Sequence, residues 1–156
     1  IMHPSRYPDD QPQAVEIALK AEDLGPEWDE VYRETVGEWY TYLILARPYD
    51  SAHQQIDSVA SAAAEGWGGD QYLILSNGKE SALVVKYQWD TEKDGDEAYK
   101  AFLAYTKLRF GSQDSADIAC KDGYCSSLMK NPDGSFTWLV SSSREVLSLL
   151  QTADVR

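Results

Sequence analysis

The sequence predicts an α+β fold, a ferredoxin-like antiparallel sheet with helices mainly on one face. Asn77-Gly78 and Asp122-Gly123 each separate two apolar stretches, which is typical of tight β-hairpins. Elsewhere apolar residues recur every three or four positions, as they do in helices that bury one face. From residue 36 to 141 the predicted order is β-α-β-β-α-β, with an added C-terminal hairpin and helix.

The chain has 156 residues, 43% of them hydrophobic, which is enough for one domain with a continuous core. Residues 1–13 are rich in Pro, Asp and Gln and predict a flexible lead-in, followed by a single domain over residues 14–156. No apolar run approaches the roughly 18 residues of a membrane span. The lead-in has no signal-peptide core, so an exported chain would have lost its leader.

The first third of the chain predicts two strands separated by one helical turn. Alternating apolar residues weakly indicate a strand over residues 14–19, and residues 20–28 predict a turn of helix that ends at Gly25-Pro26. Residues 37–46, "GEWYTYLILA", are rich in aromatic and β-branched side chains, which predicts a second strand.

The middle of the chain predicts helix, hairpin, helix. The first helix follows Asp50-Ser51 and ends at Gly66. Its buried face is an apolar stripe: Ile56, Val59, Ala60, Ala63 and Ala64. Asn77-Gly78 then joins two strands, with positive φ at both residues. A second helix, ended by Gly111, has these residues on its inner side: Ala98, Tyr99, Phe102, Leu103 and Tyr105.

The last third predicts the cysteine hairpin, a turn at residues 131–134, a strand over residues 135–141 and a final helix. The apolar residues of that helix are Val146, Leu149, Leu150 and Ala153. Ser142 and Glu145 have the spacing of a capping box at its start.

The net charge of −12 comes from 26 acidic and 14 basic residues. Such a surface repels nucleic-acid phosphates and anionic lipid, and no Lys/Arg cluster offsets it. We therefore expect no nucleic-acid partner, and contact with a membrane only through an anchor absent from this chain.

The two cysteines flank the Asp122-Gly123 turn. If these two residues form the turn, Cys120 faces Cys125 in a non-hydrogen-bonded pair, whose close Cα atoms suit a disulfide. A Cys120–Cys125 disulfide with no free cysteine predicts an extracytoplasmic location, secreted or at the cell surface.

Both faces of the predicted strands are apolar. Residues 82–89 carry Leu83 and Val85 on one side and Ala82 and Val84 on the other. Because a bare apolar face is unfavourable, we expect the N-terminal segment, a second subunit or a ligand to cover the second face. The expected partner is a protein or a second copy of the chain on that face.

Catalytic motifs are absent from the sequence, which contains no nucleophile elbow, phosphate loop, HExxH motif or dinucleotide fingerprint. Of the two histidines, His3 lies in the lead-in. His53, with Asp50 and Asp57 at helical spacing, indicates a solvated helix face. The sequence favours neither enzymatic activity nor a cofactor.

Two sets of candidate binding residues remain. An aromatic set could line a ligand pocket or belong to the core: Trp39, Tyr42, Trp67, Asp70 and Trp89. An acidic set imitates the start of a calcium loop: Asp90, Glu92, Asp94 and Asp96. That loop would need a glutamate where Ala101 stands, so we favour Thr91 or Asp90 as the N-cap of a helix, with at most a weak cation site.

The stretch "GWGGD" (66–70) is interpreted as a corner between a helix and a strand. Gly66 caps the helix, Gly68 and Gly69 turn the chain, and Asp70 braces the turn.

Four short motifs resemble, in their order, a module of uncharacterised exported or surface lipoproteins of bacteria and archaea. They are "DLGPEW" (23–28), "VGEW" (36–39), "GWGGD" (66–70) and "YQWDTE" (87–92), and the likeness covers roughly residues 20–105. The resemblance implies an exported, anchored domain and no catalytic residue.

A second resemblance is to dimeric α+β barrel monooxygenase-like domains, which share the strand-helix-hairpin-helix-strand order and a Trp-containing strand before the second helix. Those domains often carry a His or Asn for the cofactor on that helix, whereas residues 92–109 have neither. We therefore predict a non-catalytic extracytoplasmic binding or interaction domain of a surface protein or lipoprotein. The alternative is a dimeric α+β-barrel-like enzyme or a small-ligand or haem-binding protein.

Overall fold

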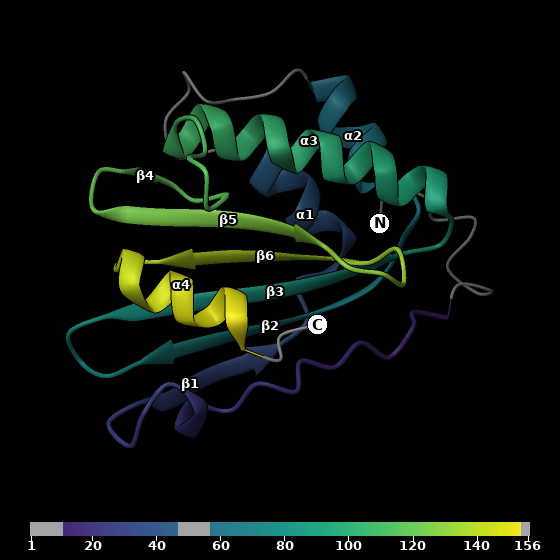
Figure 1. The fold of residues 1–156 in the computed structure, drawn as a ribbon. Coiled ribbons are helices and arrows are strands. Elements are labelled where there is room, and N and C mark those ends of the chain that lie inside the picture. Colours follow the sequence, from purple (N-terminus) through teal and green to yellow (C-terminus); the bar gives the residue numbers. More distant parts are fainter. Residues whose placement is uncertain (1–10, 47–56, 154–156) are drawn as a thin grey trace.

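The structure, a computed structural model, describes residues 11–46 and 57–153, in which six strands form one antiparallel sheet (Figure 1). The strands are β1 (Asp29–Glu34), β2 (Trp67–Ser76), β3 (Ser81–Trp89), β4 (Ala119–Lys121), β5 (Tyr124–Lys130) and β6 (Phe136–Ser141). The helices are the 3-10 turn η1 (Ala21–Asp23), α1 (Gly37–Ala46), α2 (Asp57–Ala64), α3 (Glu92–Phe110) and α4 (Arg144–Thr152). The predicted α+β class and antiparallel sheet are confirmed.

The strand order is β1-β2-β3-β6-β5-β4, which does not confirm the ferredoxin-like order. In a β-α-β unit the helix connects two parallel strands. Here β1 and β2 are antiparallel neighbours although α1 and α2 lie between them in the chain. The sheet instead consists of two antiparallel three-stranded halves, joined in the chain by α3 and in space by the β3–β6 ladder.

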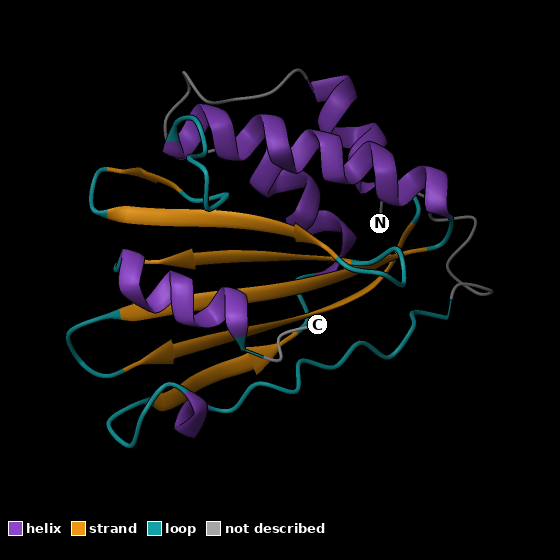
Figure 2. Cartoon of the chain, in the orientation of Figure 1, coloured by secondary structure: helices purple, strands orange, loops and turns teal. Residues whose placement is uncertain are grey.

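Two layers cover the sheet, one on each face (Figure 2). Helices α1, α2 and α3 cover what we call the first face, over a core that includes Leu45, Phe102 and Phe136. Helix α4 and residues 11–28 cover the second face, where Ile17 and Leu147 are buried. The chain's own N-terminal segment therefore covers part of the second face. This segment was one of the three alternatives that the sequence predicted.

The prediction of a strand over residues 37–46 is wrong, because these residues form α1. Asp70 supplies the acceptor for the helix N-terminus, and Thr41 and Leu45, one helical turn apart, are fully buried. Tertiary burial therefore overrides the strand preference of the aromatic and β-branched side chains. The first strand is β1, a charged stretch that the sequence analysis did not predict.

The segment 14–19 is extended but is not a strand of the sheet. Its backbone is held by side chains: the amide of Ile17 donates to Gln71 Oε1 (2.9 Å), and Arg33 donates to the carbonyls of Ile17 (2.8 Å) and Leu19 (2.9 Å). Ile17 and Leu19 are buried, so the alternation in the sequence correctly marks the buried residues. The segment nevertheless forms no backbone hydrogen-bond ladder with a strand of the sheet. The predicted helical turn in residues 20–28 is confirmed as η1.

The two amphipathic helices and both hairpins are confirmed, with local differences. The loop after β2 has four residues, Asn77–Glu80, and only Gly78 of the predicted pair has a positive φ (+79°). Asn77 Oδ1 instead accepts from the amides of Lys79 and Glu80. The last helix is capped by Ser143 and not by the predicted Ser142. The hydroxyl of Ser142 accepts instead from the amide of Ser81.

Some predicted inner residues of the helices are exposed: Val59, Leu103 and Leu149. Gly66 and Gly111 end their helices with positive φ, as expected. The positions His3, His53 and Ile56 lie outside the described residues, as do residues 1–10 of the predicted lead-in.

Candidate functional site

An apolar groove of about 660 Å³ opens on the first face, between α1 and the sheet. Its walls are formed by α1 and by strands β2 and β3: Tyr40, Leu43, Ile44, Tyr72, Ile74 and Leu83. Val85 and Trp138, both buried, lie beneath them, and Thr35 and Val36 close the end where β1 leads into α1. None of the lining residues carries a charge.

Large apolar side chains are exposed beside this groove. Tyr32 is 53% exposed and stacks on the groove residue Tyr72, with ring centroids 6.0 Å apart. Tyr40 is 64% exposed, and Trp39, 47% exposed, stacks on Tyr42 at 5.4 Å. Tyrosine and tryptophan on a surface concentrate binding energy, and a contiguous exposed apolar patch marks an interaction site.

Negative charge accompanies the apolar surface. Glu34, the last residue of β1, is the register partner of Tyr72. Burial, and then the neighbouring Tyr32 and Glu34, raise the pKa of the Tyr72 phenol above its usual range. The carboxylate of Glu34 therefore lies at the rim of the groove, next to its aromatic wall.

Asp70 fixes the position of α1 relative to the sheet. Its carboxylate is 4% exposed and accepts from the amides of Val36 (2.6 Å) and Gly37 (2.8 Å) and from Nε1 of Trp67 (2.7 Å). Burial raises the pKa of this carboxyl, against the lowering effect of the three hydrogen bonds. The stretch "GWGGD" thus holds one wall of the groove through Asp70.

Gly68 and Gly69 do not turn the chain as predicted, because both lie within β2. The register of β2 with β3 shifts between Trp67 and Gly69, which marks a bulge at Gly68. Gly69 has φ +154°, and a Cβ there would lie 2.4 Å from the Gln13 carbonyl oxygen. Glycine at position 69 is therefore required by the close approach of the N-terminal segment.

The five aromatic-set residues do not form one pocket. Trp39 and Tyr42 lie together on α1 beside the groove, and Trp67 contacts Asp70 behind it. Trp89 is 3% exposed within the first-face core. The groove residues Tyr40, Tyr72, Ile74 and Leu83 were not predicted as a site. The available signal was the apolar character of both faces of residues 82–89.

The four acidic-set residues lie near the start of α3, and two of them are held by other side chains. Asp96 pairs with Lys130 (2.5 Å), while Asp94 accepts from the hydroxyl of Thr91 (2.6 Å), and Thr91 is the N-cap of α3. Asp90, Glu92 and Asp96 all line one polar pocket of about 460 Å³, in which Lys130 also lies. Over residues 11–46 and 57–153, no group of three or more His, Cys, Asp or Glu side chains is placed to hold a metal ion.

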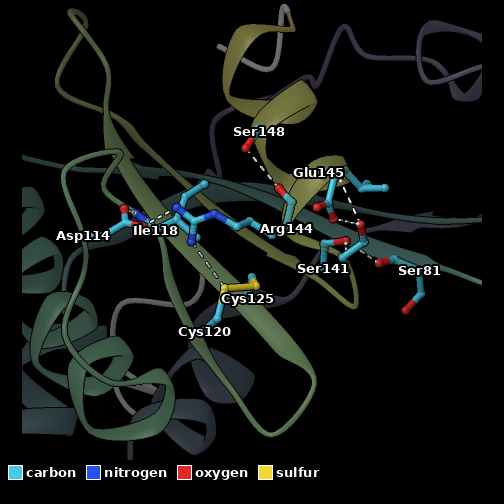
Figure 3. The surroundings of a disulfide bond; sticks show 11 residues. Ser81, Asp114, Ile118, Cys120, Cys125, Ser141, Arg144, Glu145 and Ser148 are labelled. Carbon is cyan, nitrogen blue, oxygen red and sulfur yellow. Dashed lines mark hydrogen bonds and ion pairs between the residues drawn. A yellow bond between two sulfur atoms is a disulfide. The ribbon is translucent and has the colours of Figure 1, made fainter.

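The predicted disulfide between Cys120 and Cys125 is present in the β4–β5 hairpin (Figure 3). Their Cα atoms are 4.0 Å apart, and Asp122 and Gly123 have the positive φ that the turn requires. Arg144 of α4 lies over the hairpin. Its guanidinium Nη1 is 3.8 Å from Cys120 Sγ, and its Nη2 pairs with the carboxylate of Asp114. The disulfide thereby lies at the junction of α4 and the sheet.

Comparison with known proteins gives one match. Residues 25–148 match the family described as a domain of unknown function, DUF8575. The chain belongs to the DUF8575 family. The match spans β1 to the middle of α4, so the groove and the disulfide of this DUF8575 domain both lie within the family region. No curated protein and no solved structure matches the chain. Among the described residues, none of the helices is both long and apolar enough to span a membrane.

Proposed function

We propose that this DUF8575 domain is a non-catalytic, extracytoplasmic binding domain of a surface protein or lipoprotein, and that it holds an apolar segment of a partner protein in the groove beside α1. The observation that carries the proposal is an uncharged, open groove of about 660 Å³ continuous with exposed tyrosines. Well-packed pockets that accept aliphatic or aromatic anchors are typical of helix or strand recognition by binding domains.

The way in which both walls of the groove are held also supports binding. Its sheet wall is made of central strands, and its helical wall is fixed by the buried Asp70 carboxylate. A preformed site loses little conformational entropy when a ligand enters.

The extracytoplasmic location is supported by two arguments. The Cys120–Cys125 disulfide is compatible with an oxidising compartment, where such bonds persist. The motif order "DLGPEW", "VGEW", "GWGGD" and "YQWDTE" resembles that of exported lipoproteins.

Titration with Nile red, a neutral apolar dye, tests the groove. We expect one saturable site whose affinity falls about five-fold or more in Tyr40→Ser, because the most exposed aromatic wall is removed. Tyr124→Ser is the matched control, since Tyr124 is a 46% exposed tyrosine on β5, outside the groove. Absence of a saturable site, or equal loss of affinity in both variants, would contradict the proposal.

A further inference from the structure

We propose that the segment bound in the groove carries lysine or arginine residues next to its apolar anchors. This inference rests on the proposed function and adds the charge of the partner. It follows from the distribution of charged side chains around the groove mouth.

The stretch from β1 into α1 is strongly acidic. Its one cation is Arg33, and of its carboxylates Asp29 and Glu34 pair with Ser76 and Tyr72 on the groove side of the sheet, whereas Glu30 pairs with Leu75 of the second-face core. The guanidinium of Arg33 does not offset them at the groove, because it binds the carbonyls of Ile17 and Leu19 on the second face. The guanidinium also donates to Gln71 Oε1 (3.1 Å) and pairs with Glu30 (2.8 Å), so its charge is used away from the groove.

The spacing of the anchor and charge positions is set by β1. Tyr32 and Glu34 pair with Ile74 and Tyr72, so both lie on the groove side of the sheet. Residues two apart on a strand are separated by about 6.6 Å. An extended partner that packs an apolar side chain against Tyr32 can therefore place a cation beside Glu34 when the two groups lie two residues apart.

Charge also argues against other occupants. A second copy would bring the same acidic rim and a net charge of −12 against the first, which opposes a symmetric interface. Anionic lipid is repelled for the same reason. A basic partner gains attraction at the rim without a buried ion pair, so the expected effect is faster, salt-sensitive association.

The test uses two fluorescent peptides with the same core, Leu-Phe-Leu, flanked by two lysines or two glutamates on each side. We expect the lysine peptide to bind about ten-fold tighter by anisotropy at roughly 20 mM NaCl, and this preference to shrink at roughly 200 mM. Glu34→Lys should weaken binding of the lysine peptide at least about three-fold. Glu22→Lys, which makes the same change in net charge on the exposed η1, should leave it unchanged.

Failure of this inference and failure of the proposed function give different results. If Nile red occupies the groove but the lysine peptide has no advantage, or Glu22→Lys acts like Glu34→Lys, the basic partner is overturned and the binding groove stands. If sedimentation shows a dimer that blocks the dye, a second copy is the occupant and the basic partner is again overturned. If Nile red finds no saturable site, both proposals fail.

Discussion

Trp67 and Asp70 are joined by a 2.7 Å hydrogen bond from the indole Nε1 to the carboxylate oxygen that also accepts from the Gly37 amide. Both residues lie at the start of β2, and the shared carboxylate oxygen links them to the first turn of α1 through the Gly37 amide. Because α1 forms one wall of the groove, this buried carboxylate couples a short motif to the shape of the candidate site.

Asp70→Ala should lower the free energy of unfolding by about 3 kcal/mol, because two backbone amides and one indole N–H lose their buried acceptor. Urea denaturation measures the loss. Trp67→Phe removes the indole donor and part of the ring but leaves the acceptor of the two backbone amides in place, so it should cost less, about 1 kcal/mol. A loss below about 1 kcal/mol in Asp70→Ala would show that the carboxylate does not hold α1.

Gly69→Ala should release the N-terminal segment from the second face. A Cβ would meet the Gln13 carbonyl oxygen at 2.4 Å, and the φ of +154° adds backbone strain of about 1–3 kcal/mol. We expect faster hydrogen exchange at Ile17, whose amide is protected by Gln71. Gly78→Ala is the control, because Gly78 also has positive φ but faces open space. Equal exchange at Ile17 in both variants would contradict the close approach.

The elements that the sequence predicts well are those with local signals. The Asp122-Gly123 turn fixes the register of Cys120 and Cys125 within six residues, and the stripe of α3 shows its helical period directly. Residues 37–46 could not be assigned this way, because the acceptor that starts α1 is Asp70, more than thirty positions away. The strand order likewise depends on pairing of β3 with β6, which no local pattern encodes.

The candidate site was predicted only in part for the same reason. Trp39, Trp67 and Asp70 were singled out by residue type, but which wall each belongs to depends on α1 being a helix. If residues 37–46 formed a strand, Tyr40 would not be expected to line the same groove as Tyr72. The groove follows from tertiary packing of α1 over β2 and β3.

Asp114→Asn should make the stability of the domain less dependent on pH in acid. Hydrogen bonds from the amide of Ala116 and then from Arg144 hold the pKa of Asp114 below its usual range. The stabilisation is present above the unfolded pKa of about 3.9 and is lost as the pH falls through the folded value. Urea midpoints between roughly pH 5 and pH 2 should therefore fall less in Asp114→Asn than in the parent. Parallel curves for the two proteins would contradict a folded-state role for this carboxylate.

Replacing both cysteines by serine should lower the free energy of unfolding by about 2 kcal/mol, the loop-entropy value for a ring as small as that closed between positions 120 and 125. The loss is small because few residues separate the cysteines, and Arg144 and α4 still pack over the hairpin. The parent treated with reductant should show the same shift in urea midpoint, and the double variant should not respond. Two titratable thiols in protein purified without reductant would contradict a disulfide in the native chain and remove the main support for an extracytoplasmic location.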